Sequence, residues 1–239
     1  PPEQALLLAL RTNYELKDDA GTIRSLEGLV RHYPQPKYWE DLLNAQLFRT
    51  KEDRGLRALY RLMEDTGTLD KGEEYAEMGT TLVAGGFPNE AKQVLERGMA
   101  KNVFSADSKA RAQADLERAR TGATADAKDV GTAAAQLAAA KTGTQMVAIG
   151  KLYFSAGDYA NAADAIQKGL ARGGVTDADD ANMLLGIAHA HPRRRRHAVR
   201  RLGGRHDVVR GGVVEAADGD AVHRLLLLAF CRQAAGGAP

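Results

Sequence analysis

Cysteine is nearly missing from the sequence, and because Cys231 is its single copy, no disulfide can form within the chain. Aromatic residues make up only 5% of the chain. No apolar run reaches the roughly 18 residues that a membrane-spanning helix needs, and Leu225–Phe230 is far too short. Alanine, leucine, glutamate, lysine and arginine are instead abundant, a mixture that favours helices over sheets. We therefore expect a helical chain without a transmembrane segment.

Patterns of residues that would carry catalysis or hold a cofactor are also missing. No His-Glu-x-x-His pattern occurs, and neither Gly85–Gly86 nor Gly173–Gly174 is followed by the Gly-Lys-Ser/Thr of a phosphate loop. Carboxylate pairs such as Asp18–Asp19 fall at expected helix starts, where the helix dipole favours negative charge. The sequence therefore predicts a protein that is not an enzyme, with no catalytic residue, no metal ligand and no cofactor.

A repeat of about 35 residues runs along most of the chain. Two stretches, Tyr75–Met99 and Met146–Leu170, align along their whole length and each carry a glycine at the fifth position. These glycines, Gly79 and Gly150, are 71 residues apart, which is two periods. Leu184–Ala188 repeats the start of the pattern once more. Periods of this length indicate an array of stacked structural units.

Each unit has the apolar spacing of two short helices, clearest in residues 144–156 and 159–172. Gly157 and Asp158 between them suit a helix end and the cap of the next helix. Small residues, Gly150 on the first helix and Ala162 on the second, are expected where the two helices cross closely. Their counterparts two repeats earlier are Gly79 and Ala91.

This pattern resembles the tetratricopeptide repeat over residues 3–190. The residues that fit its signature are Trp39, Gly79, Ala91, Gly150, Tyr159, Ala162 and Gly186. Its core positions on second helices match Leu26, Leu29, Leu59 and Leu62. The resemblance implies an all-α right-handed superhelix, an α-solenoid of antiparallel helix pairs. We expect about six units in residues 1–190, with the fourth, at about 105–141, degenerate and the sixth truncated.

A closer resemblance links the chain to exported proteobacterial tetratricopeptide-repeat proteins. It is carried by Tyr14–Ala20, Leu29–Pro34, Pro36–Trp39 and Leu184–Ala188. It implies a periplasmic or exported location, although a cytoplasmic location stays open. It also implies that further repeats come before this region. Ala5–Leu10 is apolar on every face, as a covered helix would be. Alternatively, Leu7 and Leu8 are exposed or pair with a second copy.

By the same resemblance, the first helix of each unit lines a concave groove that binds a partner. The residues at the corresponding positions are Arg11, Tyr14, Lys37, Asn44, Phe48, Thr80, Lys151 and Phe154. We expect a non-catalytic scaffold that binds a peptide or partner protein there. Lys37 and Asn44 do not reproduce the carboxylate clamp of chaperone-binding relatives. Two alternatives remain: the aromatic residues are core positions, or the chain is a structural array that self-associates through its exposed end repeats.

The final segment, residues 191–239, does not continue the repeat. It carries ten arginines, no lysine and four acids, a net charge of +6 against −4 for residues 1–190. It also lacks Ser, Thr, Asn, Ile, Met, Tyr and Trp. The remaining residues have GC-rich codons, so we interpret it as read out of frame or poorly ordered. Alternatives are a solvated basic tail, or anion or nucleic-acid binding through Arg193–Arg196, although no nucleic-acid motif accompanies them.

Overall fold

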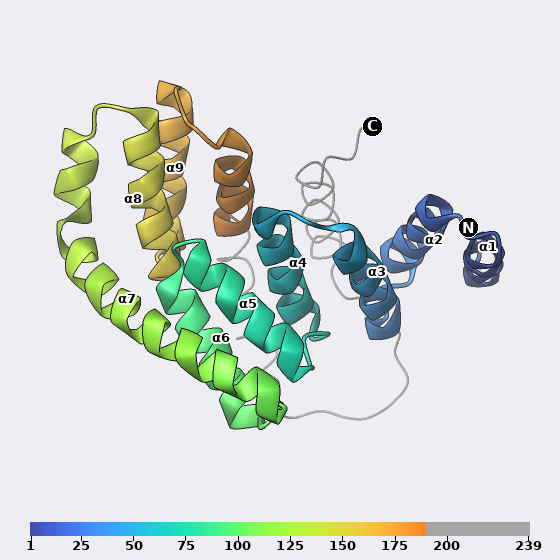
Figure 1. Cartoon of the computed structure of the whole chain (residues 1–239). Coiled ribbons are helices and arrows are strands. Elements are labelled where there is room, and N and C mark those ends of the chain that lie inside the picture. Colours follow the sequence, from blue (N-terminus) through green and yellow to red (C-terminus); the bar gives the residue numbers. More distant parts are fainter. Residues whose placement is uncertain (190–239) are drawn as a thin grey trace, which may run out of the picture. The chain divides into compact units, whose positions relative to one another are not determined.

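The structure is a computed structural model that describes residues 1–189, and every regular element in this part of the chain is an α-helix (Figure 1). The helices are α1 (Glu3–Glu15), α2 (Asp19–His32), α3 (Pro36–Arg49), α4 (Asp53–Thr66), α5 (Gly72–Ala84), α6 (Pro88–Lys101), α7 (Ala106–Ala139), α8 (Gly143–Ser155), α9 (Tyr159–Arg172) and a further helix over 178–189. The all-helical prediction is confirmed for these residues. None of their helices is long and apolar enough to cross a membrane.

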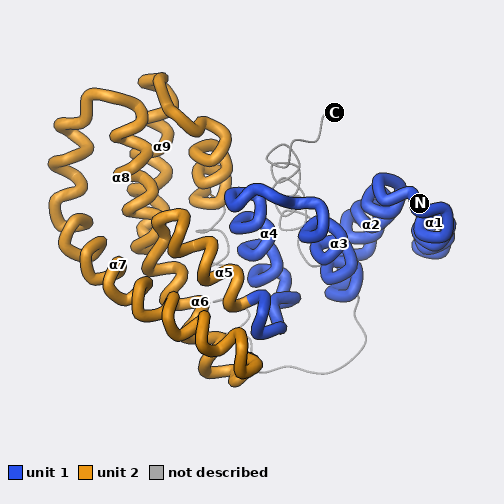
Figure 2. Tube along the Cα trace, in the orientation of Figure 1, with its two compact units in different colours: residues 1–74, 216–239 blue, residues 75–215 orange. Residues whose placement is uncertain are grey.

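The chain divides into two compact units, which Figure 2 colours separately. Among the described residues, unit 1 comprises 1–74 and unit 2 comprises 75–189. The arginine-rich segment predicted for 191–239 lies outside the described residues, together with Cys231. The predictions about that segment therefore stay predictions.

Short turns join the helices in pairs. Three residues separate α1 from α2, α3 from α4, α5 from α6 and α8 from α9, and connections of the same length join α2 to α3 and α7 to α8. The first helices of these pairs begin at residues 3, 36, 72 and 143, and the helix over 178–189 begins 35 residues after α8. The expected break at Gly157–Asp158 is confirmed, because α8 ends at Ser155 and the Asp158 carboxylate accepts a hydrogen bond from the Asn161 backbone at the start of α9.

Three of the turns share a left-handed backbone conformation at their middle residue. That residue is Gly86 between α5 and α6, with a φ of 79°, and Gly157 between α8 and α9, with a φ of 80°. Between α1 and α2 it is Lys17, with a φ of 56°. Glycine adopts this conformation freely, whereas a residue with a side chain loses roughly 1–2 kcal/mol in it.

The part of the chain aligned with the fourth repeat differs from the expected pair of short helices. Residues 106–139 form the single 34-residue helix α7, whose start is capped by the side chain of Ser105. The middle of this segment, 120–124, contains Gly122 but no Gly-Asp pair or proline to end a helix. The many alanines of the segment as a whole favour helix continuation. The buried face of α7 is mostly small, with Ala112, Ala119 and Ala123 spaced at helical intervals.

Most of the repeat signature residues lie at buried helix crossings. Tyr159 and Gly186 are exceptions, because both are half-buried and a methyl carbon added to Gly186 would have no described atom within 4 Å. Trp39, Leu26, Leu29, Leu59 and Leu62 are buried in unit 1. In unit 2, α8 packs along α9. A methyl carbon added to Gly150 would lie 2.5 Å from Ile166 Cγ1 and 3.2 Å from the Ala162 carbonyl oxygen. Added to Gly79 on α5, it would lie 2.5 Å from a methyl group of Leu95 on α6. At Gly150 the two backbones therefore approach each other too closely for a side chain, whereas at Gly79 the Leu95 side chain occupies the space that a side chain would need.

We predict that Gly150→Leu lowers the free energy of unfolding by about 1–3 kcal/mol, because the new side chain overpacks the crossing of α8 and α9. Urea unfolding followed by circular dichroism measures this change. Gly131→Ala on the exposed side of α7 is the control, since no described atom lies within 4 Å of the added methyl carbon. That variant should gain roughly 0.5–1 kcal/mol of helix stability. An unchanged midpoint for Gly150→Leu would contradict the close crossing.

Candidate functional site

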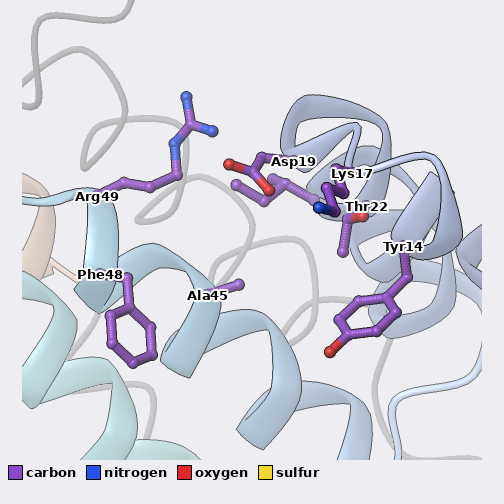
Figure 3. A pocket seen from close by; sticks show the side chains of 8 residues that line it. Tyr14, Lys17, Asp19, Thr22, Ala45, Phe48 and Arg49 are labelled. Atoms are coloured by element: carbon purple, nitrogen blue, oxygen red, sulfur yellow. The ribbon is translucent and has the colours of Figure 1, made fainter.

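A groove in unit 1 runs between the first helix pair and α3. It has a volume of about 640 Å³ and is lined by side chains from the end of α1, the turn after it, the start of α2 and the end of α3. The lining residues are Tyr14, Lys17, Asp19, Thr22, Ile23, Ala45, Phe48 and Arg49. Figure 3 shows Phe48 and Ala45 on the α3 side of the groove and Tyr14 on the α1 side.

Two aromatic rings of this groove are largely open to solvent. Tyr14 is 76% exposed and Phe48 is 84% exposed. The corresponding position in the fifth unit behaves differently: Phe154, which like Tyr14 lies eleven residues after the first residue of its helix, is 3% exposed. Its ring meets those of Phe87 and Tyr159 edge to face at centroid distances of 5.8 and 5.2 Å. The open aromatic pair is therefore a feature of unit 1 rather than of every repeat.

Two cations and one carboxylate line the same groove. Lys17 occupies the left-handed turn residue, and Arg49 is the last residue of α3. Both are exposed, and neither forms an ion pair within residues 1–189. Asp19 is the first residue of α2, where its negative charge interacts favourably with the helix N-terminus. The neighbouring Asp18 caps this helix through a 2.8 Å hydrogen bond from the Gly21 backbone.

Three predicted groove residues of unit 1 lie outside this cavity. Arg11 forms an exposed ion pair with Glu15 on its own helix, with 2.9 Å between Nε and Oε1. The ammonium of Lys37 lies 4.6 Å from the centre of the Tyr38 ring, and Asn44 is half-buried. The structure thus brings together Tyr14 and Phe48 from the predicted set, and their role in partner binding stays a prediction.

The predicted groove residues of unit 2 contact neighbouring helices. Thr80 Oγ1 on α5 donates a 2.6 Å hydrogen bond to Asp115 Oδ2 on α7. Lys151 on α8 forms an ion pair with Asp180 on the helix over 178–189. Thr80 and Lys151 are equivalent by repeat, since each directly follows the crossing glycine of its helix, and both carboxylate partners are buried. Phe154 matches the alternative interpretation of this residue as part of the core.

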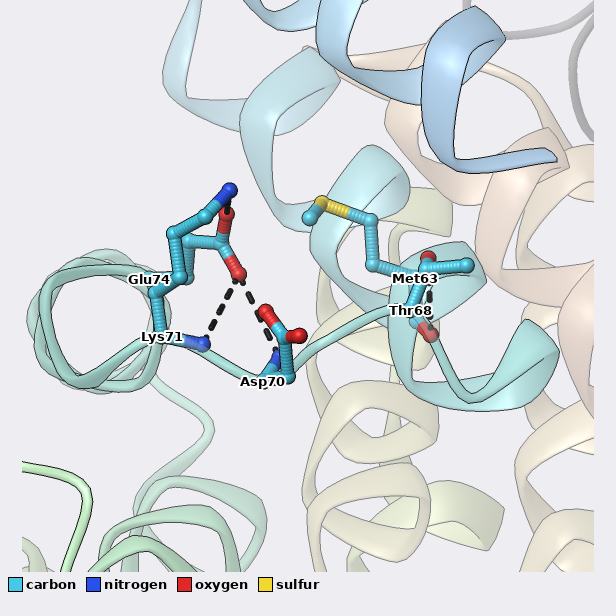
Figure 4. A network of polar contacts seen from close by, with 5 residues as sticks. All are labelled: Met63, Thr68, Asp70, Lys71 and Glu74. Carbon is cyan, nitrogen blue, oxygen red and sulfur yellow. Dashed lines mark hydrogen bonds and ion pairs between the residues drawn. The ribbon is translucent and has the colours of Figure 1, made fainter. Parts of the chain in front are cut away.

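The turn before α5 carries a polar network in unit 1 (Figure 4). The buried Glu74 carboxylate accepts weak hydrogen bonds from the backbone N–H groups of Asp70 and Lys71, at 3.4 and 3.3 Å. It also pairs with the Lys71 ammonium at 3.1 Å, and this hydrogen bond and charge raise the pKa of Lys71. The network satisfies free N–H groups at the start of a helix, so we assign it a structural role.

A second polar cluster lies where α6, α7 and α8 meet in unit 2. The Asn89 backbone N–H donates to Ser155 Oγ at 3.3 Å, and its side-chain amide donates to Asp126 Oδ2 at 3.4 Å. Burial raises the pKa of Asp126, and the charge of Asp129 adds to this, while hydrogen bonds from Ser155 and Asn89 oppose it. No group of three or more His, Cys, Asp or Glu side chains in residues 1–189 is placed to hold a metal ion.

Several lining residues of the groove were not predicted from the sequence. They are Lys17, Asp19, Thr22, Ile23, Ala45 and Arg49. A signal for Lys17 exists in the repeat itself, because aligned turns place Gly86 and Gly157 at its position. The others are spread over α2 and α3, and only the packing of α3 against the first pair brings them together.

We predict that Thr80→Val lowers the free energy of unfolding by about 1.5–3 kcal/mol, because the buried Asp115 carboxylate loses a hydrogen-bond donor. Thr124→Val on α7 is the matched control, since the Thr124 hydroxyl donates only to the Arg120 carbonyl of its own helix. The control should change stability by less than about 0.5 kcal/mol. Urea unfolding measures the free energy of unfolding of both variants. Equal losses in Thr80→Val and Thr124→Val would contradict a stabilising hydrogen bond between α5 and α7.

We also predict a pH-dependent gain of stability from Asp126→Asn. A carboxyl whose pKa is raised by folding stabilises the folded state at low pH and loses that contribution as the pH rises through the raised pKa. At pH 7 the variant should therefore unfold at a higher temperature than the parent. The difference should shrink as the pH falls toward 4, and thermal melts across this range measure it. A constant difference at every pH would contradict the raised pKa.

Comparisons of the chain with protein-family models, with curated proteins and with solved structures find no match. The functional interpretation of the groove therefore rests on its own residues and geometry.

Proposed function

We propose that this protein is a non-catalytic interaction scaffold that binds a peptide or partner protein through the groove of unit 1. The observation that carries the proposal is the pair of exposed aromatic rings, Tyr14 and Phe48, on the two sides of one groove. Exposed aromatic side chains are costly in water, and they are enriched at the energetic centres of protein interfaces. A partner that covers both rings removes their apolar surface from water.

The openness of the groove favours a polypeptide over a small molecule. Sites for small molecules enclose most of the ligand surface within buried, largely apolar walls. Here the two rings keep about three quarters or more of their surface exposed, so a small ligand would leave much of them uncovered. A peptide or a folded partner reaches both rings together with the cations beside them.

We also propose that the helix pairs are tetratricopeptide-type repeats arranged as an α-solenoid. The proposal is supported by the recurrence of first helices about every 35 residues and by the crossing glycines, Gly79 in α5 and Gly150 in α8. In such an array each unit packs against its neighbours only, and its surface serves for binding. α7, which replaces a pair by one helix, is the departure from that pattern.

Self-association is a second candidate, favoured by exposed leucines on α1. Leu8 is 66% exposed, and Leu16 directly after the helix is also exposed. If these side chains pair copies of the chain, the mass measured by light scattering should rise with concentration, and Leu8→Lys should return it to that of one chain. A constant mass across concentrations would exclude this candidate.

We predict that the full chain, used as bait in a lysate of its source organism, retains a protein that a Tyr14→Ser/Phe48→Ser variant retains at least tenfold less. Truncating an aromatic hot spot costs about 2 kcal/mol or more, and 1.4 kcal/mol corresponds to tenfold in affinity. Quantitative mass spectrometry of the eluates measures the ratio.

The matched control for this experiment is Leu8→Ser, which removes exposed apolar surface of α1 outside the groove. It should retain the partner as well as the parent does. Circular dichroism should show that all three proteins are folded, since both aromatic positions are exposed. Equal retention by the groove variant, or no retained protein at all, would contradict the proposed function of the groove.

A further inference from the structure

The turn between α1 and α2 places a lysine in a backbone conformation that the equivalent turns give to glycine. The φ of Lys17 is 56°, against 79° for Gly86 and 80° for Gly157. A side chain at this position brings its Cβ close to the following carbonyl, so a glycine would make the same turn with less strain. Lysine is not among the residues that adopt this conformation routinely.

Hydrogen bonds from the backbone N–H groups of Lys17 and Asp18 to the carbonyls of Tyr14 and Asn13 close the end of α1 in this conformation, and a glycine would keep them. The side chain of Lys17 adds no contact that compensates for the strain. Its side chain is exposed, and it has neither an ion pair nor a side-chain hydrogen bond within residues 1–189. The middle residue of the turn between α3 and α4, Lys51, is also an exposed lysine, but it is not among the residues with a positive φ. Non-glycine residues held in the left-handed region cluster at binding and active sites. The strained conformation of Lys17 therefore suggests that this residue functions in the groove that it lines.

Lys17 and Arg49 both line the groove, and Figure 3 shows Lys17 on the side of Tyr14 and Arg49 on the side of Phe48, with the Asp19 carboxylate between the two cations in this view. The one carboxylate among the lining residues, Asp19, serves the N-terminus of α2. Two cations and one carboxylate leave a net positive rim. A long phosphate backbone needs a row of cations, and the groove offers only two. A single side-chain carboxylate matches the two cations better.

We propose that the groove of unit 1 selects an acidic peptide segment, in which a Glu or Asp side chain binds Lys17 and Arg49 while a neighbouring apolar side chain covers Tyr14 and Phe48. This inference rests on the proposed function and adds the chemistry of the partner. Lys17 is then a binding residue, and its left-handed backbone aims a cation at the groove where glycine would offer none.

A selection of displayed random nine-residue peptides on the immobilised full chain tests the proposal. Binders that also bind the Phe48→Ser variant are discarded. The surviving sequences should carry at least one Glu or Asp next to an apolar or aromatic residue. One of them, synthesised with an amidated C-terminus so that only side-chain carboxylates remain, then serves as the probe in fluorescence anisotropy.

Three variants of the full chain distinguish binding from folding. Lys17→Gly should weaken binding of the probe about tenfold, because a charge-assisted hydrogen bond is lost, while it raises Tm by about 2–4 °C through relief of strain. Lys17→Gln should weaken binding by a similar factor with little change in Tm. Lys51→Gly, the same substitution in the turn between α3 and α4, should leave binding unchanged and should not raise Tm.

The outcomes separate the inference from the proposed function. Selected peptides that depend on Phe48 but lack acidic residues, or that bind Lys17→Gly as tightly as the parent, overturn the inference and leave the groove as a binding site. Replacement of the acidic residue of the probe by its amide without loss of affinity also overturns it. A selection without any Phe48-dependent peptide overturns both proposals. A lower Tm for Lys17→Gly contradicts the strain at the turn.

Discussion

Close approach of paired helices is the constraint on which unit 2 depends. At Gly150 the backbone of α8 lies against Ile166 and the Ala162 carbonyl of α9 so tightly that no side chain would fit. Gly79 makes the equivalent approach to Leu95 between α5 and α6. Because the three-residue turns hold each pair in register, the two crossings repeat with the period of the sequence.

The residues that follow the crossing glycines form polar contacts with other helices of unit 2. Thr80 and Lys151 follow the crossing glycines and point to carboxylates of the next first helix, Asp115 and Asp180. Polar groups buried between helices stabilise the fold only when they are paired. These residues therefore join successive helices of unit 2, and their side chains are engaged within the fold.

In unit 1, a residue at an equivalent helix position is exposed rather than buried. The position that holds a buried phenylalanine in the fifth unit, Phe154, holds an exposed tyrosine in the first, Tyr14. Phe154 is covered by Phe87 and Tyr159, whereas Tyr14 borders an open groove with Phe48. A lysine replaces the turn glycine beside this groove. Strain in the turn and exposed apolar surface thus coincide in one place, which is where we locate partner binding.

The sequence by itself determined the helical class, the period of about 35 residues and the turn at Gly157–Asp158, because apolar spacing and helix-ending residues act locally. The same local patterns did not reveal that α7 is one helix. A Gly-Asp pair or a proline indicates where a helix ends, but the lack of such a signal at 120–124 does not by itself show that the helix continues. Tyr14 and Phe48 were recognisable as groove candidates from their positions in the repeat. Only the tertiary structure decided that they are open and that Phe154 is buried, because exposure depends on which side chains from other helices cover each ring. It also decided that Lys17 lies beside the groove, since that position depends on packing between different helices.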